Sequence, residues 1–154
     1  MVSGERRQAD VASNLHSLDA EYGYSDVFLT EIDILKDPVK HDMLVKVNKA
    51  NLMTRVYAGE FHTAFLTPAC SSWSRVRFAP HGPKPVRNFS NPRGFPWLLG
   101  AQLKECNDAN ELVDLVIELA YAMHSVKGQY LIEHPEDLGC TREGHMPASI
   151  WQLE

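Results

Sequence analysis

Two residues of this chain have the chemistry of a nucleophile and of a hydrogen-bonding acid, and both follow short apolar segments. Cys70 comes after the run 61–67, which Pro68 ends, and Glu133 comes after the run 130–132. A thiolate is a strong nucleophile, and a carboxylic acid can hydrogen-bond the substrate that the thiolate attacks. The pair therefore predicts a site of nucleophilic attack where two strands end.

Other side chains allow further interpretations of the same region. His134, Cys140 and His145 could supply nitrogen and sulfur ligands, but their spacing is not an established zinc pattern and three ligands are too few, so we expect no metal. His62 could pair with Cys70 in a thiol hydrolase, yet a regular strand would hold the two roughly 25 Å apart. Cys70 could also be a small buried hydrophobic residue, which is the commonest role of a free cysteine.

Charge is distributed unevenly along the chain. The whole chain has 20 Asp and Glu against 15 Lys and Arg, a formal net charge of −5, yet no acid lies within residues 61–104. Six cations lie in this window, namely Arg75, Arg77, Lys84, Arg87, Arg93 and Lys104. The window also holds most of the nine prolines, together with Trp73 and Trp97, so it predicts a basic, proline-rich loop over residues 71–104.

A basic loop with interleaved aromatic residues suits a polyanion, because Lys and Arg neutralise phosphates and aromatic rings stack on bases. We therefore expect Arg75, Arg77, Lys84 and Arg87 to contact nucleic acid. The alternative is a solvated surface loop whose charges balance the acidic remainder of the chain. In that case Arg75 and Arg77 form ion pairs with nearby acids.

Strands and helices alternate along the rest of the chain. Strands are predicted at residues 26–33, 61–67 and 130–132. Helices are predicted at residues 8–20, from Asp37 to Gly59, and from a capping box at Asp108–Glu111 to near Gly128. This alternation indicates an α/β fold with a mostly parallel sheet and helices on both faces. Ligands gather at the carboxyl ends of such strands, which is where Glu31, Asp33, Cys70 and Glu133 fall.

The composition excludes several classes of protein. A chain of 154 residues with 44% hydrophobic residues suffices for a single domain over residues 1–154. No stretch approaches the roughly 20 apolar residues of a membrane span, and no apolar signal-peptide core follows the N-terminal residues 1–7. Three cysteines do not make a disulfide scaffold, which favours an intracellular, reducing compartment.

Taken in order, the motifs resemble those of the DNA (cytosine-5) methyltransferases, and most closely the divergent members found in mobile elements and large eukaryotic genomes. The segment Thr67–Arg75, TPACSSWSR, is similar to the family's Pro-Cys nucleophile loop, and Leu131–Pro135, LIEHP, resembles its Glu-Asn strand end. Glu31–Asp33 follows a predicted strand as the family's cofactor-ribose acid does, and Ser3-Gly4 resembles a remnant of the Gly-rich cofactor loop. The order and rough spacing agree over nearly the whole chain.

The resemblance implies a Rossmann-like methyltransferase fold that transfers a methyl group from S-adenosylmethionine to cytosine in DNA or RNA, in the nucleus if the source is eukaryotic. Cys70 would add to C6 of a flipped-out cytosine, and nearby cations would favour its thiolate. Glu133 would hold the ring near N3 and C4. Glu31 would accept hydrogen bonds from the ribose, and Ile32 would pack on the adenine. The cofactor-binding set would be Gly4, Glu31, Ile32, Asp33 and Pro68.

The chain also departs from the family pattern. Ala69 stands between Pro68 and Cys70, and His134 replaces the Asn that follows the glutamate. Only Met1–Val2 precede the glycine-poor cofactor loop, and the family's downstream arginine motif and target-recognition region do not follow. The resemblance therefore predicts a partial fold, belonging to a fragment or a degenerate copy. The alternative function is a non-catalytic nucleic-acid-binding remnant of such an enzyme.

Overall fold

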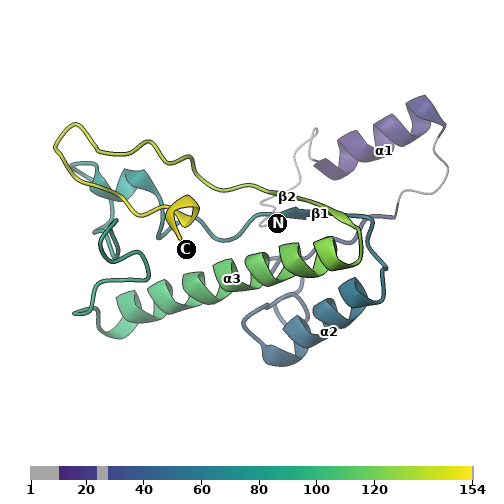
Figure 1. The fold of residues 1–154 in the computed structure, drawn as a ribbon, viewed down its shortest axis with the longest axis horizontal. Coiled ribbons are helices and arrows are strands. Elements are labelled where there is room, and N and C mark those ends of the chain that lie inside the picture. The colour runs from purple at the N-terminus through teal and green to yellow at the C-terminus, as the bar shows by residue number, and fades with distance from the viewer. Residues whose placement is uncertain (1–10, 24–27, 154) are drawn as a thin grey trace. The chain divides into compact units, whose positions relative to one another are not determined.

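The computed structural model describes residues 11–23 and 28–153, which fall into two compact units, Met1–Asp42 and Met43–Glu154. The first unit contains α1 (Val11–Tyr22). The second contains α2 (Lys46–Tyr57), β1 (Thr63–Leu66), η1 (Arg75–Phe78), α3 (Gly100–Ser125), β2 (Gln129–Ile132) and η2 (Ile150–Gln152), where η denotes a 3-10 helix (Figure 1). The chain is a mixed α/β protein, as the alternating pattern predicts.

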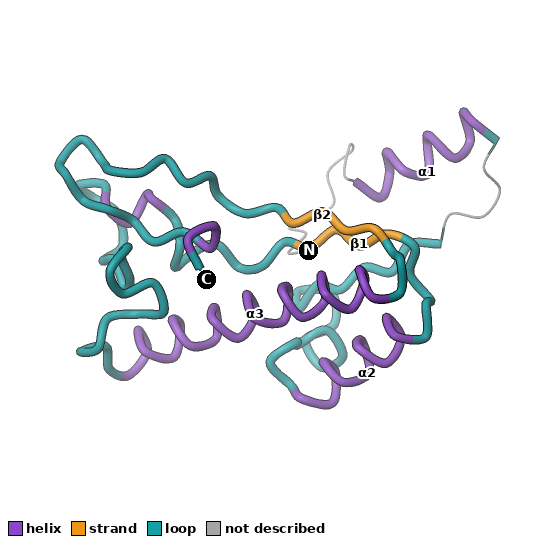
Figure 2. Tube along the Cα trace, viewed as in Figure 1, coloured by secondary structure: helices purple, strands orange, loops and turns teal. Residues whose placement is uncertain are grey.

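The two strands form a small parallel sheet, and α3 is the connection between them (Figure 2). The register pairs Thr63 with Gln129 and Leu66 with Ile132. Parallel neighbours need a long crossover, and a helix provides one because it satisfies its own backbone hydrogen bonds. The prediction of strands at these two places is confirmed, and so is their parallel pairing.

Helices α2 and α3 cover one face of this sheet. The apolar cluster between them consists of Val56, Leu66, Leu115, Val116, Leu119, Ala120, Ala122 and Met123. Ala64 and Ile132 pack against the cluster from the strands, whereas Phe65 and Leu131, which are paired in register, are exposed. Successive strand residues point to opposite faces. Within residues 43–154 the helices therefore lie on one face, where both faces had been expected to carry them.

The strand predicted at residues 26–33 is not formed in its described part, residues 28–33. The Asp33 carboxylate accepts a hydrogen bond from the Leu35 amide at 2.9 Å, and the Asp33 carbonyl accepts one from the Lys36 amide at 2.9 Å. An aspartate that bonds its neighbouring backbone competes with a strand ladder. The segment therefore closes in a turn.

The predicted starts of the two later helices are also wrong. The Asp37 carboxylate accepts hydrogen bonds from two amides of the turn that follows it, and α2 begins only at Lys46. The expected capping box at Asp108–Glu111 lies inside α3, which begins at Gly100. The Asp108 carboxylate pairs with Lys104, one turn earlier on the same helix, and so caps nothing.

Residues 67–99 form the loop between β1 and α3, so the last residues of the predicted loop belong to the helix. Val86, Leu98 and Cys106 bury a second small cluster where the loop meets α3. Gly94, at φ +121°, lies so close to α3 that an added Cβ would come within 2.6 Å of the Cys106 Sγ. A glycine is therefore required there, both for the backbone conformation and for the close approach.

Candidate functional site

The carboxyl ends of β1 and β2 lie side by side at one edge of the sheet. Leu66 pairs with Ile132, and the Glu133 amide donates to the Leu66 carbonyl at 2.9 Å, which continues the ladder by one residue. Glu133 is exposed directly after β2, and Cys70 is exposed in the turn after β1. The two segments that carry the predicted nucleophile and acid therefore leave the sheet at the same edge.

Cys70 lies at the start of a tight turn. Its carbonyl accepts a hydrogen bond from the Trp73 amide at 2.9 Å, and the side chains of Ser72 and Trp73 turn inward. The Cys70 thiol is exposed, so the interpretation of this residue as a buried hydrophobe is wrong; Cys106, with no exposed surface, has that role. His62 precedes β1 and Cys70 follows it, so a Cys–His pair is not formed.

Three of the four predicted nucleic-acid contacts, Arg75, Arg77 and Arg87, donate hydrogen bonds to the protein's own backbone. Arg75 donates to the carbonyls of Gly139 and Cys140 at 2.9 and 2.6 Å, which ties the loop before α3 to the segment after β2. Arg77 is 9% exposed, donates to two carbonyls of its own loop and pairs with Glu105 on α3. The ion-pair alternative is therefore confirmed for Arg77. Arg75 instead donates its hydrogen bonds to neutral carbonyl groups.

Arg87 is buried more deeply still, at 1% exposure. Its guanidinium carbon lies 3.8 Å from the ring centroid of Trp73, a cation–π contact. The N–H groups donate to neutral acceptors, which are the Pro92 and Cys106 carbonyls, Asn110 Oδ1, Ser72 Oγ and Cys106 Sγ. Burial lowers the pKa of Arg87 and raises the pKa of the Cys106 thiol beside it. Arg87 therefore stabilises the loop from its interior, and of the four predicted contacts Lys84 is the exposed one.

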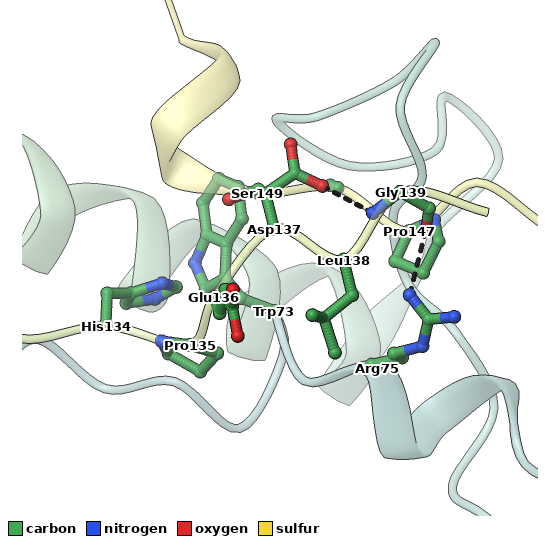
Figure 3. Close-up of a pocket in the computed structure, with 11 residues that line it drawn as sticks. Trp73, Arg75, His134, Pro135, Glu136, Asp137, Leu138, Gly139, Pro147 and Ser149 are labelled. Carbon is green, nitrogen blue, oxygen red and sulfur yellow. Dashed lines mark hydrogen bonds between the residues drawn. The ribbon is translucent and has the colours of Figure 1, made fainter. Parts of the chain in front are cut away.

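A small pocket lies between this loop and the segment after β2, and its lining includes Trp73, Arg75, His134, Asp137 and Ser149 (Figure 3). Its volume of about 20 Å³ is room for a water molecule and too little for a nucleobase. Asp137 accepts hydrogen bonds from the Gly139 amide at 2.9 Å and from Gln152 Nε2 at 2.6 Å, which secure the pocket wall.

His134 is 8% exposed, and its ring packs edge-on against Trp73 and Trp151 at centroid distances of 5.9 and 6.5 Å. Burial lowers the pKa of His134 to about 4, so its imidazole is neutral at pH 7. Figure 3 shows the Trp73 indole nitrogen turned toward this ring. Neither imidazole nitrogen nor the Trp73 indole nitrogen has a hydrogen-bond partner among the described residues. The side chain next to the exposed Glu133 is thus an inward-facing, neutral packing group.

The residues expected to hold the cofactor do not form a ribose-binding strand end. Glu31 pairs with Lys36, and Asp33 is buried with its carboxylate bonded to its own turn. Ile32 lies between them in irregular backbone, and Gly4 lies outside the described residues. Pro68, the remaining member of the set, is buried just beyond β1. The described residues therefore do not fit S-adenosylmethionine, because the strand end that would present Glu31 is not formed and the Asp33 carboxylate is buried in its own turn.

Neither a metal centre nor a membrane span is found among the described residues. No group of three or more His, Cys, Asp or Glu side chains there could hold a metal ion. No described helix is long and apolar enough to cross a membrane.

The sequence interpretation missed the roles of Trp73 and His134. In the sequence, Trp73 is one aromatic residue of a basic loop, and His134 is both a departure from a family motif and a candidate metal ligand. One signal was present: a tryptophan among arginines can stack with them. Which arginine it meets depends on the folding of the loop.

Comparison with known proteins adds no family assignment. No protein-family model, no curated protein and no solved structure matches the chain. The function is therefore argued from the residues and their geometry.

Proposed function

We propose that this chain is a cytosine-5 methyltransferase-like protein in which Cys70 and Glu133 act on a nucleic-acid base. The supporting observation is the β1–α3–β2 unit. Both residues follow adjacent parallel strands, and both are exposed at the same edge of the sheet. In this proposal β1 and β2 are two strands of a larger Rossmann-like sheet.

The proposed reaction is addition of the Cys70 thiolate to C6 of a cytosine. The sulfur lone pair forms the S–C6 bond, the C5=C6 π bond breaks, and its electron pair moves onto C5, which becomes nucleophilic. Glu133 hydrogen-bonds the ring near N3 and C4, which stabilises the charge that develops there. A base in a duplex cannot reach an exposed thiol beside a sheet, so the substrate is a single-stranded or extruded nucleotide.

The methyl donor of the proposed reaction would be S-adenosylmethionine, which supplies an electrophilic methyl group when bound. The strand end that would present Glu31 to this donor is not formed and Asp33 is buried in its own turn, so these residues do not fit it. The proposal therefore covers base binding and thiol addition, and its test uses a substrate that needs no methyl donor.

That test uses an oligonucleotide with pyrimidin-2-one in place of cytosine, because the C6 of this base accepts a thiolate directly while C5 takes a proton from water. We expect intact mass spectrometry to show a covalent adduct that Cys70→Ser abolishes. Cys140→Ser is the matched control, since Cys140 is the other exposed cysteine, and it should react like the unmodified chain. An adduct that survives Cys70→Ser would overturn the proposal.

Glu133 is tested in the same assay. Glu133→Gln replaces the carboxyl group without changing side-chain size, and we expect adduct formation to slow by about 10²- to 10³-fold. Glu136→Gln, at a nearby exposed glutamate, is the control and should leave the rate unchanged. Equal rates for the two variants would remove Glu133 from the proposed site.

The second candidate is a non-catalytic nucleic-acid-binding remnant. It is favoured by the engagement of Glu31 and Asp33 within their own turn. It predicts salt-sensitive, sequence-indifferent DNA binding, no thermal shift with S-adenosylmethionine, and no adduct at Cys70. Arg77 is buried, so its substitution does not test contacts with DNA phosphates. Lys84→Ala tests them, because Lys84 is exposed.

A further inference from the structure

A stacked aromatic pair, the partly buried Phe95 and the exposed Trp97, lies in the basic loop just before α3. The rings of Phe95 and Trp97 are stacked, with centroids 4.7 Å apart and planes inclined by 7°. Trp97 is 68% exposed, which is unusual for so large an apolar side chain. Because Phe95 covers one face of the indole, the opposite face is the one available to a ligand.

Packing and backbone hydrogen bonds fix the position of this pair. Phe95 packs against the buried cluster of Val86, Leu98 and Cys106. The Phe95 amide donates to the Val86 carbonyl at 3.0 Å, and the Leu98 amide donates to the Phe95 carbonyl at 3.2 Å. A planar ring whose support is already ordered loses little conformational freedom when a second ring stacks on it.

Three exposed cations flank the aromatic pair in the sequence. No acid lies between Phe61 and Lys104, and three cations of this stretch, Lys84, Arg93 and Lys104, are exposed. Arg93 pairs with Asp114 at 2.7 Å and Lys104 pairs with Asp108, both across exposed contacts on α3. Exposed ion pairs of this kind are weak, so phosphates can replace the aspartates.

We propose that Phe95 and Trp97 form a stacking platform for an unpaired nucleobase, with the phosphates of the same strand bound by Lys84, Arg93 and Lys104. The partner is single-stranded nucleic acid, because a base inside a duplex has both faces covered by its neighbours. The inference takes its partner class from the proposed function, but it is carried by different residues from Cys70 and Glu133.

The test measures binding of a fluorescein-labelled oligothymidylate to the full chain by anisotropy. Trp97→Ala should weaken binding by roughly five-fold to a hundred-fold, which is the usual effect of removing one stacked ring. Trp97→Tyr should keep most of the affinity. Tyr121→Ala is the matched control, because Tyr121 is equally exposed, at 74%, on the outer surface of α3, and it should bind like the unmodified chain.

Electrostatics gives a second readout. Phosphate contacts from three cations predict a slope of about −2 in a plot of log affinity against log salt concentration, and Lys84→Ala should make the slope shallower by about 0.7. Indole emission should be quenched on binding in the unmodified chain and remain unchanged on binding in the Trp97→Tyr variant.

Several results would overturn the platform. These are unchanged affinity in Trp97→Ala, no oligothymidylate binding by the unmodified chain, equal preference for duplex DNA, or a Trp97-dependent self-association that shows a protein interface. Failure of the two proposals is distinguishable. Loss of the pyrimidin-2-one adduct with intact Trp97-dependent binding removes only the catalytic proposal, and the reverse result removes only the platform.

Discussion

The second unit contains two kinds of interior. Between α2, α3 and the sheet, the interior is an apolar cluster that includes Leu119 and Met123. Between the loop 67–99 and α3, two buried guanidinium groups, those of Arg77 and Arg87, lie beside the small apolar cluster that contains Cys106. The same helix, α3, contributes to both.

The difference follows from where backbone hydrogen bonds go. Helices and paired strands satisfy their own carbonyl groups, so the space between them can be filled with apolar side chains. The loop has backbone hydrogen bonds in its turns but no helix or strand ladder outside η1, and arginine side chains donate to several of its carbonyls. A segment rich in proline and arginine can therefore be a well-packed part of a fold.

The largest effect should come from removing the centre of the polar interior. Arg87→Ala leaves the buried acceptors on Ser72 and Asn110 without their donor and uncovers the face of Trp73, so we expect the free energy of unfolding to fall by about 3–5 kcal/mol. Urea denaturation measures it. Arg142→Ala, at an exposed position, is the control and should change stability by less than about 0.5 kcal/mol. A loss below about 1 kcal/mol for Arg87→Ala would contradict a structural role for this residue.

The free energy of unfolding should depend on pH because His134 is buried in its neutral form. Its folded-state pKa of about 4 lies below the ordinary value of 6.5, so at intermediate pH the unfolded chain binds more protons. The free energy of unfolding should therefore fall as the pH drops from 6.5 toward 4, by about 2–3 kcal/mol in total from this group. Denaturation curves across this window measure it.

His134→Gln is the comparison variant for that experiment. It removes the titrating group but keeps a polar side chain, so its stability should vary less steeply over the same pH range. If the two chains have the same slope, protonation of His134 does not contribute.

The smallest effect should come from an ion pair at the outer edge of the polar interior. Arg93 and Asp114 join the loop to α3, but each side chain is nearly half exposed. We expect Arg93→Ala to lower the free energy of unfolding by no more than about 1 kcal/mol. A loss as large as that of Arg87→Ala would mean that exposed contacts hold the loop as firmly as buried ones do.

Some parts of the fold were predictable because their signals are local. The apolar runs before Pro68 and before His134 end where a chain must leave a sheet, and β1 and β2 lie there. The helix between them has apolar residues at helical spacing, and a parallel pair requires such a crossover. Cys70 and Glu133 could therefore be placed at one sheet edge from the sequence.

Other predictions failed because a polar side chain had more than one possible partner. Asp33, Asp37 and Asp108 were interpreted as a strand end and as helix starts. They instead bond their own turns or, in the case of Asp108, a lysine one turn away. A carboxylate has the same sequence signature in each of these roles.

The sequence by itself determined the α/β class, the two parallel strands and the exposed edge that carries Cys70 and Glu133. Only the tertiary structure decided which cations face solvent. Six cations lie in one acid-free stretch of the sequence, yet Arg77 and Arg87 turn inward and donate to backbone carbonyls, whereas Lys84 is exposed. The reason is that burial of a guanidinium depends on acceptors brought together from distant parts of the loop and from α3, and no local pattern encodes their arrangement.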